Sequence, residues 1–296
     1  KNRRLIRPNG LVVMSGANNA DLRLPAAGPI DPVVPILAFT DPGGYPIAIV
    51  TNYAVHNNCV GGVYHGDLGG RIGDALRETY GLQLVTPFLE APCADVIWAG
   101  PKEGPRRGDA LARLIGDSVC EGVSVAQGET SPVPVEEIRM RVTVEDYPDR
   151  LWEDSTFCRD DSRGDTPEAR ARQRRRYDPE EATVLARGET TCPLELMGIS
   201  FGETAIITNP AELFVEFGIE IKERSPFDVT LVSELTNGYC GYVGTEKAFE
   251  EQGYEVHRTV YTSRLVKDSG RRMTDASVQM LEDLREEEWE LPKGLE

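Results

Sequence analysis

Apolar and polar positions succeed one another along the chain in patterns that predict alternating strands and helices. Residues 36–40 and 45–55 are apolar and flank an Asp-Pro-Gly-Gly turn, which predicts a hairpin. Apolar residues recur at helical spacing from Ile72 to Thr79, and residues 82–89 predict a further strand. Strand, helix and strand in this order predict a βαβ unit, with a site where the carboxyl ends of its parallel strands meet.

The same criteria divide the rest of the chain. They predict helices over 109–122, 209–222, 246–251 and 274–288, strands over 133–146, 194–201, 203–208 and 228–235, and a polar hairpin through 254–257. Residues 1–35 are irregular and predict an extended segment that lies over other parts of the fold. Residues 147–190 are charged and predict a helical insertion within the domain, with helix starts at 166–168 and 178–181. We therefore expect one α/β domain over 1–296, with a mixed sheet and βαβ units covered by helices.

Composition limits the class of protein. With 296 residues, 40% hydrophobic and 27% charged, the chain can bury a sizeable core. A net charge of −17 argues against binding of nucleic acid, and the basic run 170–176 between acidic stretches predicts a solvated helix face. The apolar runs are shorter than the roughly 20 residues of a membrane span, so we expect a soluble protein, either cytoplasmic or secreted.

The cysteines show neither a disulfide framework nor zinc-finger spacing. No CxxC pair occurs among them, so free buried thiols are the expectation, with disulfides left open. The six residues are Cys59, Cys93, Cys120, Cys158, Cys192 and Cys240.

Two of the three histidines lie in one stretch that is a candidate site. His56 ends the apolar strand, and small residues, His65, Asp67 and a Gly-rich helix start follow it. Catalytic groups often lie on loops at strand ends, where a rigid sheet holds them. The alternative for His56 is a buried, hydrogen-bonded core histidine.

At three places along the chain, an apolar strand is followed by a turn that carries a potential metal ligand. The residues are His56, Glu212 and Tyr242. Imidazole and carboxylate are ordinary zinc ligands, whereas tyrosine is uncommon. Taken singly, Glu212 is also explained by a helix N-terminus, and Tyr242 by a buried aromatic residue with a satisfied hydroxyl.

Four segments, in order, resemble motifs of the neutral, non-lysosomal ceramidase family. They are Val50-Thr51-Asn52-Tyr53-Ala54-Val55-His56 with Asp67-Leu68-Gly69-Gly70, then Asn209-Pro210-Ala211-Glu212, then Asn237-Gly238-Tyr239-Cys240-Gly241-Tyr242 with Tyr254-Glu255 downstream. The resemblance spans about residues 30 to 260. It implies an α/β catalytic domain, here its C-terminal portion, in which one zinc ion activates water to hydrolyse a linear amide.

Carried over by motif, the resemblance implies that His56, Glu212 and Tyr242 hold the zinc ion, or another divalent metal. The family's fourth ligand lies in an upstream His-rich segment that this sequence lacks. We therefore expect a second polypeptide, or a cleaved part, to supply a His-x-His segment. Ile97 stands where the family's Gly-Asp-Val-Ser segment has serine, so we expect a small-molecule amide other than ceramide as substrate.

The remaining candidates have supporting roles. We expect His65 to donate a proton to the leaving amine, Asp67 to orient a ligand histidine, and Asp95 to act in catalysis or in structure. Tyr239 and Asn237 are candidate pocket residues. Two rival functions stay open. One is a non-catalytic subunit that completes the site of a partner chain, and the other is a metal-free hydrolase with Cys93 as nucleophile, although a buried thiol is more often inert.

Overall fold

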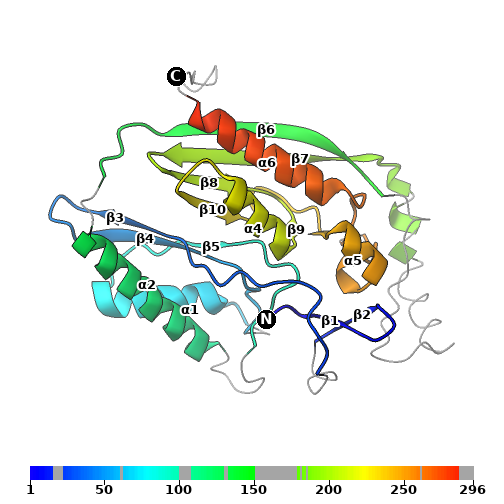
Figure 1. Cartoon of the computed structure of the whole chain (residues 1–296), viewed down its shortest axis with the longest axis horizontal. Coiled ribbons are helices and arrows are strands. Elements are labelled where there is room, and N and C mark those ends of the chain that lie inside the picture. The colour runs from blue at the N-terminus through cyan, green and yellow to red at the C-terminus, as the bar shows by residue number, and fades with distance from the viewer. Residues whose placement is uncertain are drawn as a thin grey trace.

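Two main sheets lie side by side, and each carries a pair of helices (Figure 1). A computed structural model describes residues 1–15, 23–60, 63–99, 108–129, 133–150, 179–180, 182–184, 186–260 and 262–286. The first sheet has the order β3-β4-β5, formed by Ile36–Thr40, Pro46–Tyr53 and Phe88–Glu90. The second has the order β10-β8-β7-β6, formed by Val229–Ser233, Thr204–Thr208, Thr191–Phe201 and Arg139–Pro148. The mixed α/β class agrees with the prediction.

Short elements frame these sheets. Two small pairs of strands are β1 (Arg4–Ile6) with β2 (Val12–Met14), and β9 (Glu212–Leu213) with β11 (Tyr242–Val243). The helices are α1 (Asp67–Tyr80), α2 (Asp109–Glu129), α4 (Val215–Arg224), α5 (Glu246–Glu251) and α6 (Ser269–Arg285), with a 3-10 turn at Tyr254–Val256. The pair α1 and α2 packs beside the first sheet, and the pair α4 and α6 packs on the second.

The predicted βαβ unit is present as β4, α1 and β5. Strands β4 and β5 pair in parallel, with Thr51 opposite Phe88. Helix α1 buries Leu68, Ile72 and Leu76, one apolar stripe at a spacing of four residues. This stripe holds α1 beside the sheet, so the loop between β4 and α1 lies at the carboxyl edge of the strands.

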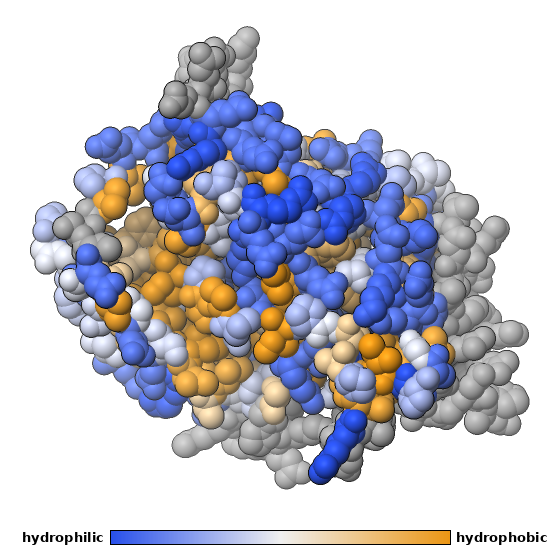
Figure 2. Space-filling view, viewed as in Figure 1, coloured by the Kyte–Doolittle hydropathy of each residue, from blue (hydrophilic) through white to orange (hydrophobic). Residues whose placement is uncertain are grey.

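Helix α2 extends to Glu129, beyond the predicted end at residue 122. It buries Ile115 and Val119 on one side and exposes Leu114 and Val125 on the other. The second set continues the helical pattern but faces outward. Figure 2 shows hydrophobic side chains gathered over α2 and β3, whereas the surface over α6 is polar. Because α2 is apolar on both sides, its pattern alone does not mark its end.

The two sheets are joined by the side chain of Asn52. Its Nδ2 donates to the carbonyl oxygens of Leu89 and Val232, at 2.9 Å each, and its Oδ1 accepts from the Val232 N–H. The Glu234 N–H also donates to the Glu90 carbonyl. These contacts bring the segments that follow β4, β5, β8 and β10 to one place, as expected at the carboxyl ends of strands in an α/β fold.

Strand pairing corrects three local predictions. Glu212 lies in β9 and not in the first turn of a helix, because the Glu212 N–H donates to Gly241 and the Phe214 N–H donates to Val243. The helix therefore begins only at Val215. Residues 1–35 are not irregular throughout, since β1 and β2 form an antiparallel pair.

The other boundaries differ less. Residues 254–256 form a 3-10 turn rather than a hairpin, the strand over 82–89 is reduced to Phe88–Glu90, and the last helix runs from Ser269 to Arg285. Both helix starts proposed for the insertion over 147–190 fall largely outside the described residues. Five cysteines, all those in the described part, are free thiols.

Candidate metal centre

The three residues predicted to hold a metal ion converge. His56 Nε2 lies 3.7 Å from Glu212 Oε2, and the side chain of Tyr242 hydrogen-bonds to that of Glu212. His56 follows β4, Glu212 lies in β9, and Tyr242 lies in β11. Three side chains from distant segments thus place a nitrogen and two kinds of oxygen around one position.

Strand pairing sets the position of the two oxygen donors. Tyr242 and Glu212 are direct partners in the parallel β9–β11 pair, so their side chains leave the same face. The Tyr239 hydroxyl donates to Glu212 Oε1 at 2.9 Å, which fixes the second carboxylate oxygen. Burial and the Glu212 carboxylate raise the pKa of Tyr239. Burial likewise raises the pKa of Tyr242, although Arg3 acts in the opposite direction.

The guanidinium of Arg3 lies within this group of donors, which the sequence did not predict. Arg3 Nη1 is 3.0 Å from His56 Nε2, and the guanidinium also hydrogen-bonds to Tyr242 and lies 5.5 Å from the centre of its ring. Arg3 Nε pairs with Glu255 Oε1 at 2.8 Å. Although burial lowers it, the charge of Glu255 gives Arg3 a raised pKa, so the side chain is charged.

The imidazole of His56 is neutral. Burial, and then the positive charge of Arg3, lower the pKa of His56 to about 4. An arginine only donates hydrogen bonds, so Nε2 must present its lone pair to Arg3 Nη1 and Nδ1 must carry the proton. This is the tautomer in which Nε2 is free to accept a hydrogen bond or to bind a metal ion.

A second polar group lies on the Nδ1 side of the ring. Cys93 Sγ is 3.4 Å from His56 Nδ1, 3.5 Å from Glu90 Oε1 and 3.0 Å from Glu234 Oε1. Among the described residues, His56, Glu90 and Cys93 form a group whose ligand atoms lie within 4.8 Å of one another, close enough for a metal ion. With Nδ1 protonated, however, the histidine has no lone pair to offer on this side.

Glu234 ties this side of the ring to β9. It is buried, its Oε1 accepts the Cys93 N–H at 3.1 Å, and its Oε2 accepts the Leu213 N–H at 2.7 Å. Burial raises the pKa values of Glu234, Glu90 and Cys93. Since only a thiolate is a strong nucleophile, the neutral Cys93 thiol is poorly suited to the role of nucleophile.

His65 and Asp67 lie in a different neighbourhood. They line a cavity of about 460 Å³ at the start of α1, together with Asn57, Arg77 and Phe88. His65 is exposed, and its Nδ1 accepts the Asp67 N–H. In the described part of the chain, no hydrogen bond or ion pair joins His65 to His56, Glu212 or Tyr242.

The side chains of Asp67 and Asp95 accept hydrogen bonds from backbone N–H groups. The Asp67 carboxylate accepts the N–H groups of Cys59, Val60 and Leu68, at 2.8–3.0 Å. Asp95 Oδ1 accepts the Val215 N–H, and its Oδ2 accepts from Asn2 Nδ2. These contacts match the structural role that the sequence left open for Asp95, and the carboxylate of Asp67 contacts backbone N–H groups of its own loop.

Asn237 lies at the edge of the centre. Its Nδ2 donates to Glu195 Oε1 at 2.7 Å, and its backbone has a φ of 60°. Asparagine tolerates this left-handed conformation better than most residues. Asn237 is thus a turn residue that contacts Glu195 and lies two positions before Tyr239 in the sequence.

Four residues of the centre were missed by sequence reasoning, namely Arg3, Glu90, Glu234 and Glu255. All are charged residues that are buried or largely buried. A buried charge resembles a surface charge in the sequence, so no periodicity marks it. For Glu90 and Glu234 one signal is present, since each stands at the end of an apolar strand, as His56 does.

Comparison with solved structures gives this arrangement a context. A ceramidase complexed with C2 matches with a TM-score of 0.60 and 16% identity, over 89% of this chain and 50% of that one. The fold resembles part of that of a neutral ceramidase. Neutral ceramidase from Pseudomonas aeruginosa matches with a TM-score of 0.57 and 16% identity, over 88% of this chain and 48% of that one. The chain thus spans about half the length of these ceramidases. No family model and no curated protein sequence matches.

The donors are of kinds that bind a divalent metal ion. A neutral imidazole nitrogen, a carboxylate oxygen and a phenol oxygen meet around one position, and the tautomer of His56 leaves Nε2 unprotonated. No helix in the described residues is long and apolar enough to cross a bilayer.

Proposed function

We propose that the chain is the zinc-binding part of a ceramidase-like hydrolase that cleaves a linear amide bond. The observation that carries the proposal is the convergence of His56, Glu212 and Tyr242, predicted from separate motifs, at one position of a ceramidase fold. His56 Nε2, the Glu212 carboxylate and the Tyr242 hydroxyl would hold the ion. If bound there, a zinc ion would lower the pKa of its water from about 15.7 towards 7 and would polarise the scissile carbonyl.

The protein's own residues prepare this site. Burial keeps His56 neutral at physiological pH, so its Nε2 lone pair needs no deprotonation step before it binds a metal ion. Tyr239 holds one oxygen of Glu212 and leaves the other facing His56. Ile97 brings no hydroxyl to the segment after Asp95, in line with a substrate other than ceramide.

We further propose that the fourth protein ligand comes from a second polypeptide with a His-x-His segment. The chain covers half of the length of the ceramidases that it resembles, and the family's fourth ligand lies in an upstream His-rich segment that this sequence lacks. A histidine from a partner chain would raise the affinity of the site for zinc, and the three ligands from this chain would stay the same.

The test measures zinc content and amide hydrolysis together in a matched pair of variants. The protein is purified with any chain that accompanies it and assayed on a panel of fluorogenic N-acyl amides. His56→Ala should lose the bound zinc and at least about a thousandfold in hydrolysis. His65→Ala removes a histidine of the same stretch that lies in another neighbourhood, and it should keep both. Unchanged metal and activity in His56→Ala would refute the proposal.

A second function, the non-catalytic subunit, is favoured by one observation. Arg3 donates to His56 Nε2, so a cation of the protein itself occupies the centre in this conformation. If that state is permanent, the chain would bind no zinc and only complete the fold of a partner. Metal analysis of the wild-type chain, alone and with any copurifying chain, separates the two functions.

A further inference from the structure

The first sheet ends at the edge strand β3, and the second sheet extends one strand further than the first. Resting on the proposed function, we propose that the polypeptide with the His-x-His segment adds an apolar strand to β3. That strand would lie opposite β6 and cover its exposed apolar residues. The second polypeptide would thus be bound by backbone hydrogen bonds along β3 and by apolar contacts with β6.

The two main sheets face each other between their helices (Figure 1). Ile49 of β4 packs in one cluster with residues of α1 and α2, and Gly198 of β7 lies against side chains of α6. Phe39 of β3 and Phe201 of β7 leave the other faces of these sheets. Their ring centres lie 6.2 Å apart. Strand β3 therefore lies opposite β7.

The strand that the second sheet has in addition is β6. Val142 pairs with Met197 of β7, so its side chain points to the same side as those that face the first sheet. Val142 and Val144 of β6, and Ile138 just before it, are 45%, 64% and 61% exposed. Antiparallel sheets that face water usually carry polar residues on that side. An apolar face on an edge strand therefore indicates that another segment covers it.

The outer edge of β3 offers backbone groups to a further strand. The Asn52 N–H donates to the Pro35 carbonyl, so the backbone groups of residues 35, 37 and 39 face β4. The N–H and carbonyl groups of Ile36 and Ala38 therefore point away from β4. Within the described residues, Ala38 forms no backbone hydrogen bond on this side. A strand added here would satisfy these groups.

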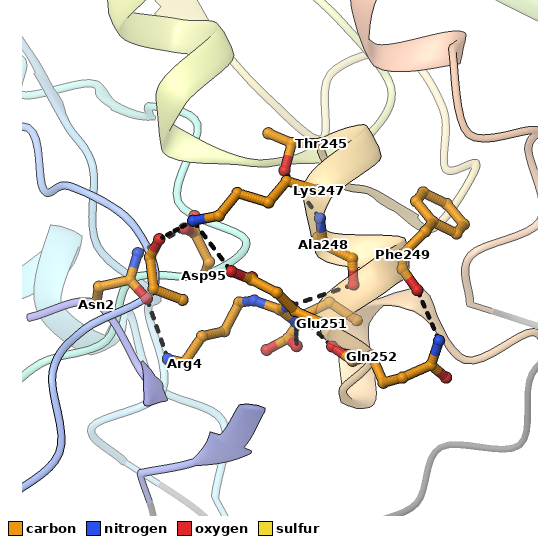
Figure 3. A network of polar contacts seen from close by, with 11 residues as sticks. Asn2, Arg4, Asp95, Thr245, Lys247, Ala248, Phe249, Glu251 and Gln252 are labelled. Atoms are coloured by element: carbon orange, nitrogen blue, oxygen red, sulfur yellow. Dashed lines mark hydrogen bonds and ion pairs between the residues drawn. The ribbon is translucent and has the colours of Figure 1, made fainter. Parts of the chain in front are cut away.

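Two other strand edges near the centre are already occupied. The outer edge of β5 meets β10, where the Glu234 N–H donates to the Glu90 carbonyl. Strand β1 pairs with β2 on one side, and on the other its Arg4 carbonyl accepts the Ala27 N–H. The side chain of Arg4 continues into a network with Glu251 of α5 (Figure 3). These two edges therefore cannot take a further strand.

A strand beside β3 would end close to the proposed metal centre. Ile36, at the start of β3, pairs with Thr51, near the end of β4, and His56 follows β4. The added strand would lie two strand spacings from β4, roughly 10 Å. If it runs parallel to β4, it ends at the same edge as His56. A few extended residues, at about 3.3 Å each, then bring a His-x-His segment to the centre.

A second copy of this chain does not fit the same place. If two copies paired through β3, the strand opposite β6 would be β3 of the other copy. That strand is already covered by β7 of its own second sheet, because Phe39 contacts Phe201. Strands of two copies would then compete for one position. The chain covers 50% of the ceramidase that it matches, so a different polypeptide is the source of the strand.

The experiment places a photo-crosslinking residue in the full chain, produced in its natural host. The residue p-benzoylphenylalanine takes the place of Ile138, which is 61% exposed, or of Leu114, which is 64% exposed on the outer side of α2. Irradiation should cross-link the position of Ile138 to a polypeptide with a His-x-His segment, identified by mass spectrometry. The position of Leu114 is the matched control and should give no such product.

A proline variant tests the edge of β3 itself. Ala38→Pro removes an N–H that points away from β4, and an edge strand tolerates proline there, so circular dichroism should show a folded chain. The cross-linking yield from Ile138 should fall at least about tenfold, because the added strand loses a hydrogen bond and meets the proline ring. Ala38→Val keeps the N–H and should retain the yield.

Three outcomes would overturn the inference. One is that Ile138 cross-links only to this chain or to a second copy, or forms no cross-link. Another is an equal yield from Leu114, and the third is a yield that a folded Ala38→Pro does not lower. If Ala38→Pro does not fold, the comparison of Ile138 with Leu114 decides alone.

Failure of this inference is distinct from failure of the proposed function. A complex that contains zinc and hydrolyses amides, but gives no cross-link from Ile138, overturns only the docking of a strand at β3. A complex that cross-links as expected, but keeps its zinc in His56→Ala, overturns only the proposed function.

Discussion

The centre at His56 and the cavity at His65 differ in how they are built. Each pairs a histidine with a carboxylate, yet the partners of His56 come from β9, β11 and the segment before β1, whereas His65 meets residues of its own loop and the neighbouring helix and strand. His56 is largely buried and His65 is exposed. Contacts with distant segments thus bury His56 and lower its pKa.

The carboxylates show the same contrast. Glu212 accepts hydrogen bonds from the hydroxyls of Tyr239 and Tyr242 and faces a nitrogen of His56. All of these partners are side chains, which can change their contacts when a ligand binds. Asp67 gives both oxygens to backbone N–H groups. A carboxylate that is saturated by backbone stabilises a loop and has little capacity left for a ligand.

The largest expected effect separates these two carboxylates. Glu212→Gln removes a proposed ligand charge and should lower zinc affinity and amide hydrolysis by at least about 100-fold, because even partners outside the ligand shell contribute about 10–100-fold. Asp67→Asn should keep zinc affinity within about threefold but lower the free energy of unfolding by about 1–3 kcal/mol, through weakened bonds to buried N–H groups. Zinc titration and urea unfolding of both variants test the contrast. Equal zinc affinities in the two variants would remove the distinction.

The next effect concerns Glu234, which links the two sides of the His56 centre. Glu234→Ala leaves the N–H groups of Cys93 and Leu213 without acceptors and should lower the free energy of unfolding by about 3–5 kcal/mol. The amide of Glu234→Gln keeps one carbonyl oxygen for one of these N–H groups but sets its NH2 against the other, so this variant should recover only part of that loss. Urea unfolding at neutral pH measures both. A glutamine variant as stable as wild type would show that only one of the two N–H groups depends on the side chain of Glu234.

Local sequence patterns predict part of this centre, and contacts between segments far apart in the sequence form the rest. The β4-α1-β5 unit follows from apolar runs and a helical stripe, because these patterns are local and the burial of Leu68, Ile72 and Leu76 confirms them. Glu212 was placed in a helix because Asn209-Pro210 resembles a helix start. Pairing with Tyr242, thirty residues away, outweighs that local preference.

The buried charges could not be predicted. Arg3 looks like part of a basic, irregular segment, and its position depends on backbone contacts with Asp95 and on an ion pair with Glu255, at the other end of the chain. No periodicity encodes such a contact. Motif order placed His56, Glu212 and Tyr242 together, but it gave no sign that a guanidinium lies between them.

A smaller effect is a dependence of stability on pH that comes from His56. The folded-state pKa of His56 is about 4, below the ordinary value of 6.5. Between these values the unfolded chain binds the proton and the folded chain does not. The contribution of neutral His56 is therefore fully present above pH 6.5 and lost as the pH falls towards 4, on the order of 3 kcal/mol in total.

Urea unfolding between pH 7 and 4 measures this loss as the difference between wild type and His56→Gln. Because Glu90, Glu234 and Glu255 lie near residue 56 in both proteins, their titration contributes equally to both curves and drops out of the difference. His65→Gln is the control, because it removes a histidine but keeps His56, and it should still lose stability relative to His56→Gln as the pH falls. A wild-type curve parallel to that of His56→Gln would mean that His56 is exposed to solvent or already charged.

The smallest effect tests whether Tyr239 supports the centre from its rim. Its hydroxyl donates to Glu212 Oε1 at 2.9 Å, yet the side chain is 52% exposed, so water can replace much of the lost bond. Tyr239→Phe should weaken zinc affinity by about tenfold or less. Tyr45 is the matched control, because it is 53% exposed and its hydroxyl donates to the Tyr80 carbonyl beside α1. Tyr45→Phe should leave zinc affinity unchanged, and a similar loss in both variants would mean that Tyr239 does not act through Glu212.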